Sequence, residues 1–479
     1  LRSSRLCGEI HSEELVMLTL IIRKEILNNI LSLRFIVTLL LFFILIMGSI
    51  SMMSANYRKQ LSDYSEGRIG MEQRLKQAKD LTEIQTMGLS AEKRPTALGV
   101  FAIGLEKEMT RSATVNLWQD AQVGGSKYAN PLFLLYQTPD ATYIVNIVIS
   151  LLAILFVFDT ISGEKEEGTL KLMLSNSVPR DAILLGKWIG GFLSLIIPFL
   201  LAFFGGWVVT YLLAPISLKG DQGLNLLGFL ITSLLYISAF FALGMFISTL
   251  THRSGTSLMV ALFAWVILVL TIPNVTPIIA RQIQPTPSTG KMAGERQAIQ
   301  REEFEAAREE IQEKQLWDDR DKVQERFEEA RKGIHKRWER VLDFNRKKLN
   351  EQADLAVILS RISPSAAYVY GATHITGTGI ADFRALRQDI KRFMGEYEEA
   401  MRKIREARQE QTKDLEDEAQ RQQIMNAKVE IEQLPKFRFH ERGFNACLNS
   451  ALIDLVLLVI FNVLFFLGAF LKFMRYDVT

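Results

Sequence analysis

The chain has 479 residues, of which 48% are hydrophobic and 23% are charged, and its formal net charge is +3. These averages are ordinary for a soluble protein, yet the apolar residues are gathered into blocks and the charges fill the gaps between them. The near balance of charge gives no support to nucleic-acid binding, which requires a basic face. The two cysteines lie far apart, and the five histidines never occur at metal-ligand spacing. We therefore expect neither a disulfide framework nor a metal site.

The N-terminal region comprises residues 1–32. Residues 1–16 are polar, lack the apolar core of a signal peptide and precede Met17, so we expect an upstream extension or a misread start. In residues 17–32, apolar side chains recur at near-helical spacing with charged and amide side chains between them. This pattern predicts an amphipathic helix in the membrane interface; the alternative is a cytoplasmic extension of the first span.

Six apolar blocks are long enough, at about 20 residues each, to cross a bilayer as helices. They cover residues 33–53, 141–160, 187–213, 224–249, 256–275 and 447–471. With six spans, the short segments rich in Lys and Arg all fall on one side, which the positive-inside rule makes cytoplasmic. Both termini are then cytoplasmic, in a bacterial or archaeal inner membrane. We expect an all-α polytopic membrane protein with six transmembrane helices and a mainly helical extracytoplasmic domain.

The first extracytoplasmic segment, residues 54–140, begins as a polar helical pattern that Pro95 interrupts. Gly124, Gly125 and Pro131 mark loops nearer the second span. The sequence predicts a helix followed by a smaller and less regular portion.

The second extracytoplasmic segment, residues 276–446, opens with a proline-rich linker and continues as two charged helical patterns, 292–358 and 381–433. In each, apolar residues recur in steps of three and four, which places a narrow apolar seam on a charged rod. The expectation is two long coiled-coil-like arms that pack antiparallel as a projecting hairpin. The alternative is two amphipathic helices that lie across a compact domain.

Residues 359–379 join the two arms and are small, apolar and aromatic, unlike the charged residues on either side. A hairpin tip in water is not expected to have this composition. Three interpretations remain open: a return to the outer membrane surface, a docking surface for a partner, or packing into the hinge between the arms.

The segment between the second and third spans, residues 161–186, is short, charged and amphipathic. It predicts a short helix, a break at Pro179 and entry into the third span; by itself it also fits an ordinary interfacial loop. The run Glu164–Leu170, with Arg180 and Gly186–Lys187, resembles the loop after the second span of ABC-2 type transporter permeases. The proline of this sequence comes later than is common in that family, which leaves the end of the helix open.

The resemblance also covers the six spans and the interfacial helix. The stretch Arg361–Ala367, followed by Gly377–Gly379, resembles the subgroup with a large outer insertion between spans five and six. The resemblance implies a second permease copy or a related permease, and a separate ATPase (nucleotide-binding) subunit that carries ATP and Mg. No phosphate-binding Gly-x-x-x-x-Gly-Lys-Ser/Thr motif occurs, so we expect no ATP hydrolysis and no cofactor on this chain. The residues expected to contact the ATPase are Glu164, Glu167, Gly168, Thr169, Leu172 and Arg180.

Four functions are weighed for such a chain. The first is export, or lipid-linked extrusion, across the lipid bilayer, driven by a partner ATPase. The second is mechanotransmission, in which the arms act on an extracytoplasmic partner protein without transport. A membrane scaffold without an ATPase leaves the 161–186 loop unexplained. An intramembrane enzyme needs polar groups for its chemistry, and away from the span edges charges are nearly absent apart from Asp454. Asp454 with Asn449 marks a pathway or an interhelical hydrogen bond.

Overall fold

The structure is a computed structural model of the chain. It describes residues 2–78, 80–107, 112–116, 119–123, 139–175, 179–213, 220–413, 415, 417–425 and 427–476. The chain forms two compact units. Unit 1 comprises Leu1–Trp265 and Ala367–Thr479, and unit 2 comprises Val266–Ala366.

Six helical stretches in the described part of the chain are long and apolar enough to cross a membrane, which confirms the six predicted spans. They are Leu33–Gln77, Ala141–Glu166, Arg180–Leu213, Gln222–Leu250, Ser254–Ile283 and Phe444–Met474. Their elements are α2 (Leu33–Phe42), η1 (Phe43–Met47), α3 (Gly48–Gln77), α6 (Ala141–Tyr143), η4 (Ile144–Ile149), α7 (Ser150–Val157), α8 (Ser162–Glu166), α10 (Arg180–Leu213), α11 (Gln222–Leu250), α12 (Ser254–Trp265), η5 (Val266–Thr271), α13 (Ile272–Ile283) and α19 (Phe444–Met474).

Residues before the first span form a helix of their own, α1 (Arg2–Ile30). The chain breaks at Leu31 and Ser32, and the Ser32 hydroxyl caps α2 by accepting the Phe35 amide at 3.3 Å. Helix α1 packs on α10. A Cβ on Gly186 would lie 2.6 Å from Ile21, and one on Gly190 would lie 2.7 Å from Glu25. Small residues therefore allow the close approach, and α1 is a separate helix rather than a continuation of the first span.

The chain after the first span includes strands, which the all-α expectation did not contain. Helix α4 (Leu81–Met87) leads into β1 (Leu89–Glu92), β2 (Ser112–Asn116) and β3 (Gln119–Val123), with 3₁₀ turns η2 (Ala97–Val100) and η3 (Gly104–Lys107) between β1 and β2. The sheet is antiparallel in the order β1-β2-β3, with Leu89 opposite Val115. Its strands have four or five residues, too short for a clear alternating pattern.

Helix α17 (Ile380–Thr412) covers this sheet, and together they form what we call the α/β lobe, built from α4, β1–β3 and α17. The apolar seam of α17 is almost fully buried, at 0–5% exposure, and consists of Leu386, Ile390, Phe393, Tyr397 and Met401. It packs against Leu75, Ile84, Leu89, Val115, Val429 and Leu434. Helix α18 (Glu418–Met425) and the turn η7 (Ile431–Gln433) follow before the chain enters α19.

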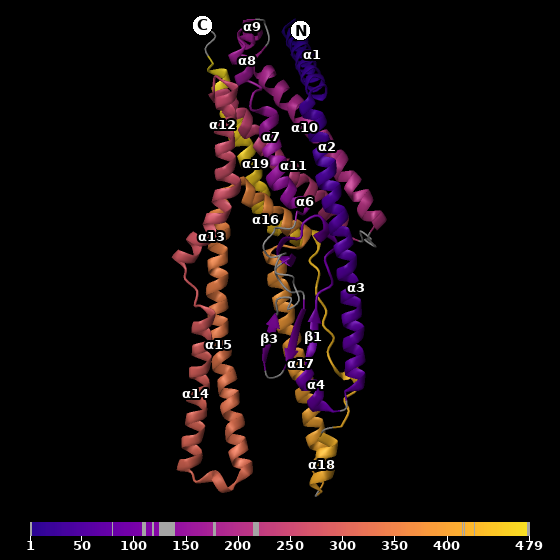
Figure 1. Ribbon diagram of the computed structural model, residues 1–479, viewed down its shortest axis with the longest axis vertical. Helices are drawn as coiled ribbons and strands as arrows, with labels where there is room; N and C mark the ends of the chain where they lie inside the picture. The colour runs from indigo at the N-terminus through magenta and orange to yellow at the C-terminus, as the bar shows by residue number, and fades with distance from the viewer. Residues whose placement is uncertain are drawn as a thin grey trace. The chain divides into compact units, whose positions relative to one another are not determined.

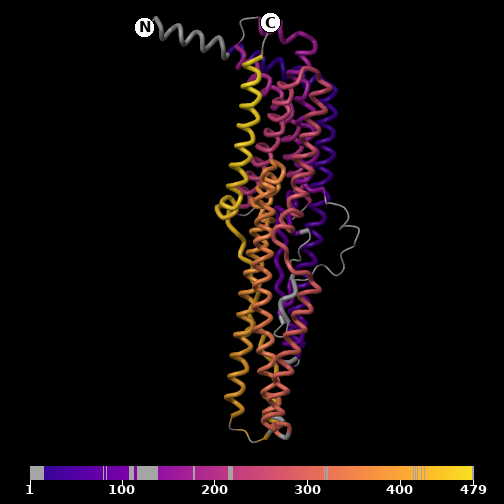
Figure 2. Tube along the Cα trace, turned by 90° about the vertical axis from the view of Figure 1, so that its left-hand side faces the viewer, coloured from indigo at the N-terminus to yellow at the C-terminus, as the bar shows by residue number. Residues whose placement is uncertain are grey.

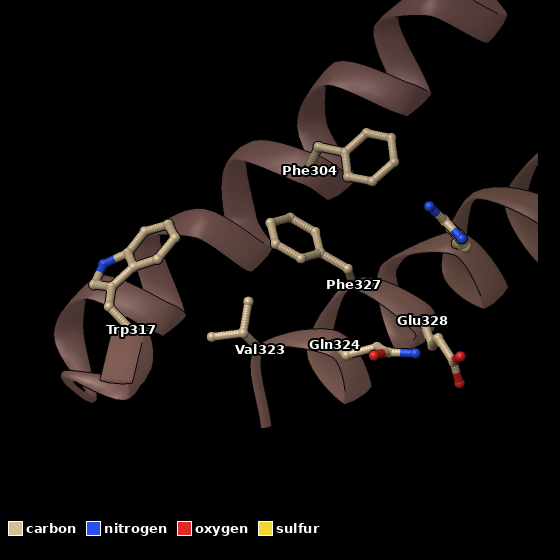
Figure 3. Close-up of a pocket in the computed structure, with 7 residues that line it drawn as sticks. Phe304, Trp317, Val323, Gln324, Phe327 and Glu328 are labelled. Carbon is tan, nitrogen blue, oxygen red and sulfur yellow. The ribbon is translucent and has the colours of Figure 1, made fainter. Parts of the chain in front are cut away.

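Unit 2 contains a helical hairpin made of α14 (Thr289–Glu313) and α15 (Arg320–Ser360), joined by the turn η6 (Leu316–Asp318). Phe304 and Phe327 face each other between the two helices, with ring centroids 6.2 Å apart (Figure 3). Arg337 forms salt bridges to Glu302 and Glu303 at 2.8 and 3.1 Å. Val323 and Trp317 line a hollow of about 410 Å³ beside the two rings.

The predicted pairing of the two arms with each other is wrong. The first arm, 292–358, turns back on itself at residues 314–319 and pairs with itself inside unit 2. The second arm, 381–433, belongs to unit 1, where its helix lies across a compact lobe, as the alternative interpretation proposed. The break follows from local chemistry: Gln315 adopts φ 52°, and the Asp319 carboxylate caps α15 by accepting the Lys322 amide.

The apolar segment 359–379 forms helix α16 (Pro364–Thr376), and its second half packs among the spans of unit 1. Tyr368 stacks on Tyr236 of α11 with ring centroids 4.4 Å apart, and its hydroxyl lies 3.1 Å from that of Ser233. Ile375 contacts α11 at Gly228. Packing into a hinge between the arms does not describe this placement, because α11 and not an arm provides these contacts. A return to the outer membrane surface stays a prediction.

Candidate functional site

Two short helices follow α7: α8 (Ser162–Glu166), at the end of the second helical stretch, and α9 (Thr169–Ser175), after it. The Ser248 hydroxyl of α11 accepts the backbone amides of Ile161 and Ser162 at 3.1 and 3.0 Å. These amides belong to the first turn of α8, where no helical carbonyl is available to accept them. The start of α8 is therefore fixed by a side chain from the fourth span.

The link between α8 and α9 depends on Gly168, which has φ +75°. This left-handed conformation is costly for residues with a Cβ atom and accessible to glycine. The Thr169 hydroxyl lies 3.4 Å from the carbonyl of Glu164. Thr169 thus contacts α8 across the glycine that separates the two helices.

Glu164 points inward. One of its carboxylate oxygens lies 2.8 Å from Nζ of Lys187, a buried residue of α10. Glu25 of α1 lies 3.8 Å from the same ammonium group. Three elements, α1, α8 and α10, therefore meet at one cation. Removing one partner of such a buried ion pair leaves an uncompensated charge and is strongly destabilising.

Two residues that the sequence analysis did not select make further contacts from α8. The Lys165 ammonium donates to the carbonyls of Thr249 and Thr251, at 2.5 and 3.0 Å, where α11 ends. The Glu166 carboxylate accepts the Ser254 amide at 2.9 Å, where α12 begins. Both contacts match the helix dipoles, with a cation at a C-terminus and an anion at an N-terminus. The charges were visible in the sequence, but nothing in their spacing indicated which helix ends they contact.

Arg180, at the start of α10, binds the C-terminal end of α19. Its guanidinium donates to the carbonyls of Met474 and Tyr476 at 2.8 and 2.9 Å. The α8–α9 segment and the end of α19 lie at the same end of unit 1 in both views (Figure 1 and Figure 2). Asp159, at the end of the second span, pairs with Arg34 of the first span at 2.8 Å.

The six residues expected from the sequence to contact the ATPase divide into two groups. Glu164 and Arg180 contact other helices of unit 1, whereas Glu167, Gly168, Thr169 and Leu172 are exposed. Leu170, between them, is fully buried, and Leu172 is 69% exposed. Helix α9 is therefore held by one apolar residue and presents another, with adjacent polar groups, at the surface.

Asn449 and Asp454, the two polar residues expected to lie together in the sixth span, have different surroundings. Asn449 is exposed, and Asp454 is fully buried. Asp454 lies 3.5 Å from Nδ1 of His374, which is on α16. A side chain of the sixth span thus meets the returning helix, and His374 is the partner that the sequence analysis did not identify.

The architecture defines a polytopic helical membrane protein with a short structured segment between its second and third spans. The sequence matches the family described as ABC-2 family transporter protein over residues 19–478, and the chain belongs to this family. It is similar to a protein of Pseudomonas aeruginosa named probable ABC transporter permease protein NosY, with 32% identity over 130 residues. That match covers 27% of this chain and 47% of the relative, so the chain spans about half the length of the relative.

Proposed function

We propose that this chain is the membrane-spanning permease subunit of an ABC transporter that exports or extrudes a substrate with ATP hydrolysed on a separate subunit. In this proposal the end of unit 1 that carries α8 and α9 faces the cytoplasm, and the exposed face of α9 contacts the ATPase. Two permease chains, identical or related, form the transporter. The family and the NosY relative support the permease role.

The observation that carries the proposal is the set of polar contacts made by α8 and by the chain next to it. Glu164 contacts α10 and α1 through Lys187, Lys165 contacts the end of α11, and Glu166 contacts the start of α12. Arg180 adds α19. A displacement of α8–α9 by a partner therefore acts directly on α10, α11 and α12, and through Lys187 and Arg180 of α10 on α1 and α19, as ATP-driven rearrangement of the spans requires.

Leu172→Glu tests the contact directly. It places a charge on the exposed face of α9 and changes no contact of α8, so the partner ATPase subunit should copurify at least tenfold less well. A tenfold loss corresponds to about 1.4 kcal/mol. Leu349→Glu is the matched control, because Leu349 is also exposed (45%) and lies on α15. Equal copurification of both variants with wild type, at equal thermal stability, would refute the assignment of α9.

A second candidate function is mechanotransmission, and the hairpin of unit 2 is the observation that favours it. Ion pairs such as Arg337 with Glu302 join its two helices, and Trp317 at its turn is 56% exposed and borders the hollow beside Phe304 and Phe327 (Figure 3). The hollow is also lined by Gln324, Glu328 and Arg331, so it offers both aromatic and charged contacts, and tryptophan is enriched among the residues that anchor protein partners.

The hairpin is removable without loss of the α/β lobe. The Gln352 side-chain amide donates to the Gln284 carbonyl at 2.5 Å, so a short glycine–serine linker can replace residues 286–350. If the hairpin transmits force, the deletion preserves ATPase activity of the complex and reproduces the phenotype of a full gene deletion. If the spans alone form the transport path, the phenotype stays close to that of wild type, and mechanotransmission is rejected.

A further inference from the structure

A continuous groove runs along α3 where this helix extends beyond the apolar part of the first span. Two hollows of about 680 and 730 Å³ form it, and both are bordered by Tyr64, Arg68 and Arg94. Each volume is within the range of small-molecule binding sites, roughly 300–1,000 Å³. From Arg58 to Leu75, the groove follows the helix for about 25 Å, at 1.5 Å per residue.

The two hollows differ in chemistry. The hollow nearer the span is lined by three arginines, Arg58, Arg68 and Arg94, together with Tyr64 and uncharged residues of α3, and no carboxylate lines it. All three arginines are exposed, and none is in a salt bridge with another residue that the structure describes. This end of the groove therefore attracts an anion, and guanidinium groups suit phosphate and carboxylate oxygens in particular.

The hollow farther from the span has an apolar floor. It is lined by apolar residues of α3, the edge strand β1, α17 and the extended chain before α19, which runs beside β1 (Figure 1). These residues are Met71, Leu75, Leu89, Phe393, Ile431, Leu434, Phe437 and Phe439.

The extended chain alternates along the groove: Phe437 and Phe439 pack against the core, and Lys436 and Arg438 are exposed. Three carboxylates, Glu72, Glu92 and Glu441, also line this hollow, and Glu72 is paired with Lys76 at 3.0 Å.

We propose that this groove binds an anionic phospholipid of the membrane in which the protein lies. The phosphate of the lipid would meet Arg58, Arg68 and Arg94, close to where the first span leaves the apolar layer. One acyl chain would lie along α3 on the apolar floor, which shields it from water. The arginines lie nearer the apolar part of the first span and the apolar floor lies farther from it, so the bound lipid is one drawn out of the bilayer, with its headgroup at the arginines and its acyl chain along the floor.

The site lies outside the α8–α9 contacts, so its test is independent of the proposed function. The chain is reconstituted in nanodiscs of phosphatidylcholine with a minority of phosphatidylglycerol, and a photoreactive p-benzoylphenylalanine is placed at position 71. We expect an adduct with the mass of phosphatidylglycerol, formed at least tenfold more than the phosphatidylcholine adduct after correction for abundance. An adduct with the mass of a second protein molecule would instead identify a second copy of this protein in the groove, and it would overturn the proposal.

The arginines are tested by the triple variant Arg58→Gln, Arg68→Gln and Arg94→Gln, which should remove the preference for phosphatidylglycerol. The matched control carries Arg402→Gln, Lys403→Gln and Lys413→Gln, the same change in charge on exposed residues of α17 and at its C-cap. The control should keep the preference. Equal labelling by both lipids in the wild-type protein, or an unchanged preference in the triple variant, overturns the proposal.

Discussion

Helices α15 and α17 have the same kind of sequence pattern, a charged rod with an apolar seam, and they pack in different ways. The seam of α17 is buried on all sides by the strands, α4 and the chain near Leu434, with Phe393 3% and Tyr397 0% exposed. The seam of α15 faces α14, and Phe327 and Ile334 remain partly exposed. The difference shows that the neighbours, and not the seam, decide whether such a helix becomes a core element or half of a hairpin.

The largest effect is expected for Phe393→Ala. Phe393 is buried in the α/β lobe and makes an edge contact with Phe437 at 5.5 Å, so its removal leaves a cavity among several elements. We expect a loss of about 3–5 kcal/mol in the free energy of unfolding. Thermal unfolding of the purified chain in detergent measures it. A loss below about 1 kcal/mol would show that the lobe does not depend on this seam.

A smaller effect is expected for Phe327→Ala, the corresponding change in the hairpin. Phe327 is partly exposed and has the ring of Phe304 as its aromatic contact. Half of the free energy gained by fully burying a phenylalanine side chain is about 1 kcal/mol, and we expect the free energy of unfolding to fall by this amount. Hydrogen exchange should increase in α14 and α15 and stay unchanged in α17. Increased exchange in both regions would remove the distinction between them.

The smallest effect is expected for Tyr397→Phe. The Tyr397 hydroxyl is buried and has no hydrogen-bond partner among the described residues, so its loss should change stability by less than about 1 kcal/mol, in the stabilising direction.

Tyr397 also gives a pH dependence. Burial raises the pKa of Tyr397 to about 12. The neutral phenol is thus favoured in the folded state. Its contribution to the free energy of unfolding is fully present below about pH 10, the pKa of an unfolded tyrosine. It is lost as the pH rises toward 12. Unfolding followed by circular dichroism between pH 9 and 12 should show a weaker alkaline decline in the Phe variant; an identical decline would contradict this account.

The spans were predictable because hydropathy depends on local composition, and six blocks became six helices. The strands were not, because β1 to β3 are short and carry Ser, Thr, Asn and Gln among few apolar residues. The pairing of the arms was not predictable either. Helices α14, α15 and α17 have apolar seams of similar spacing, and this spacing does not indicate which two of them pack together. The composition of 359–379 indicated burial, but its partners, Tyr236 and Ser233, come from a span more than 120 residues away.

The candidate site was likewise predictable where it depends on local sequence and not where it depends on packing between distant helices. A local pattern located the segment and the glycine at position 168, whose positive φ is a backbone property. The contacts of Lys165 and Glu166 depend on where α11 ends and α12 begins, and therefore on the packing of three spans. The inward direction of Glu164 likewise depends on Lys187, which sequence spacing does not place opposite it.

Helix α16 has a consequence for how this protein can vary. Because its second half is seated on α11 and near α19, the long insertion between the fifth and sixth spans is anchored in its middle. The insertion is thereby divided into a hairpin on one side of the anchor and the α17 region on the other. Each part can be shortened, lengthened or exchanged without altering the register of the other, so the hairpin and the α17 region can diverge separately on one unchanged set of spans.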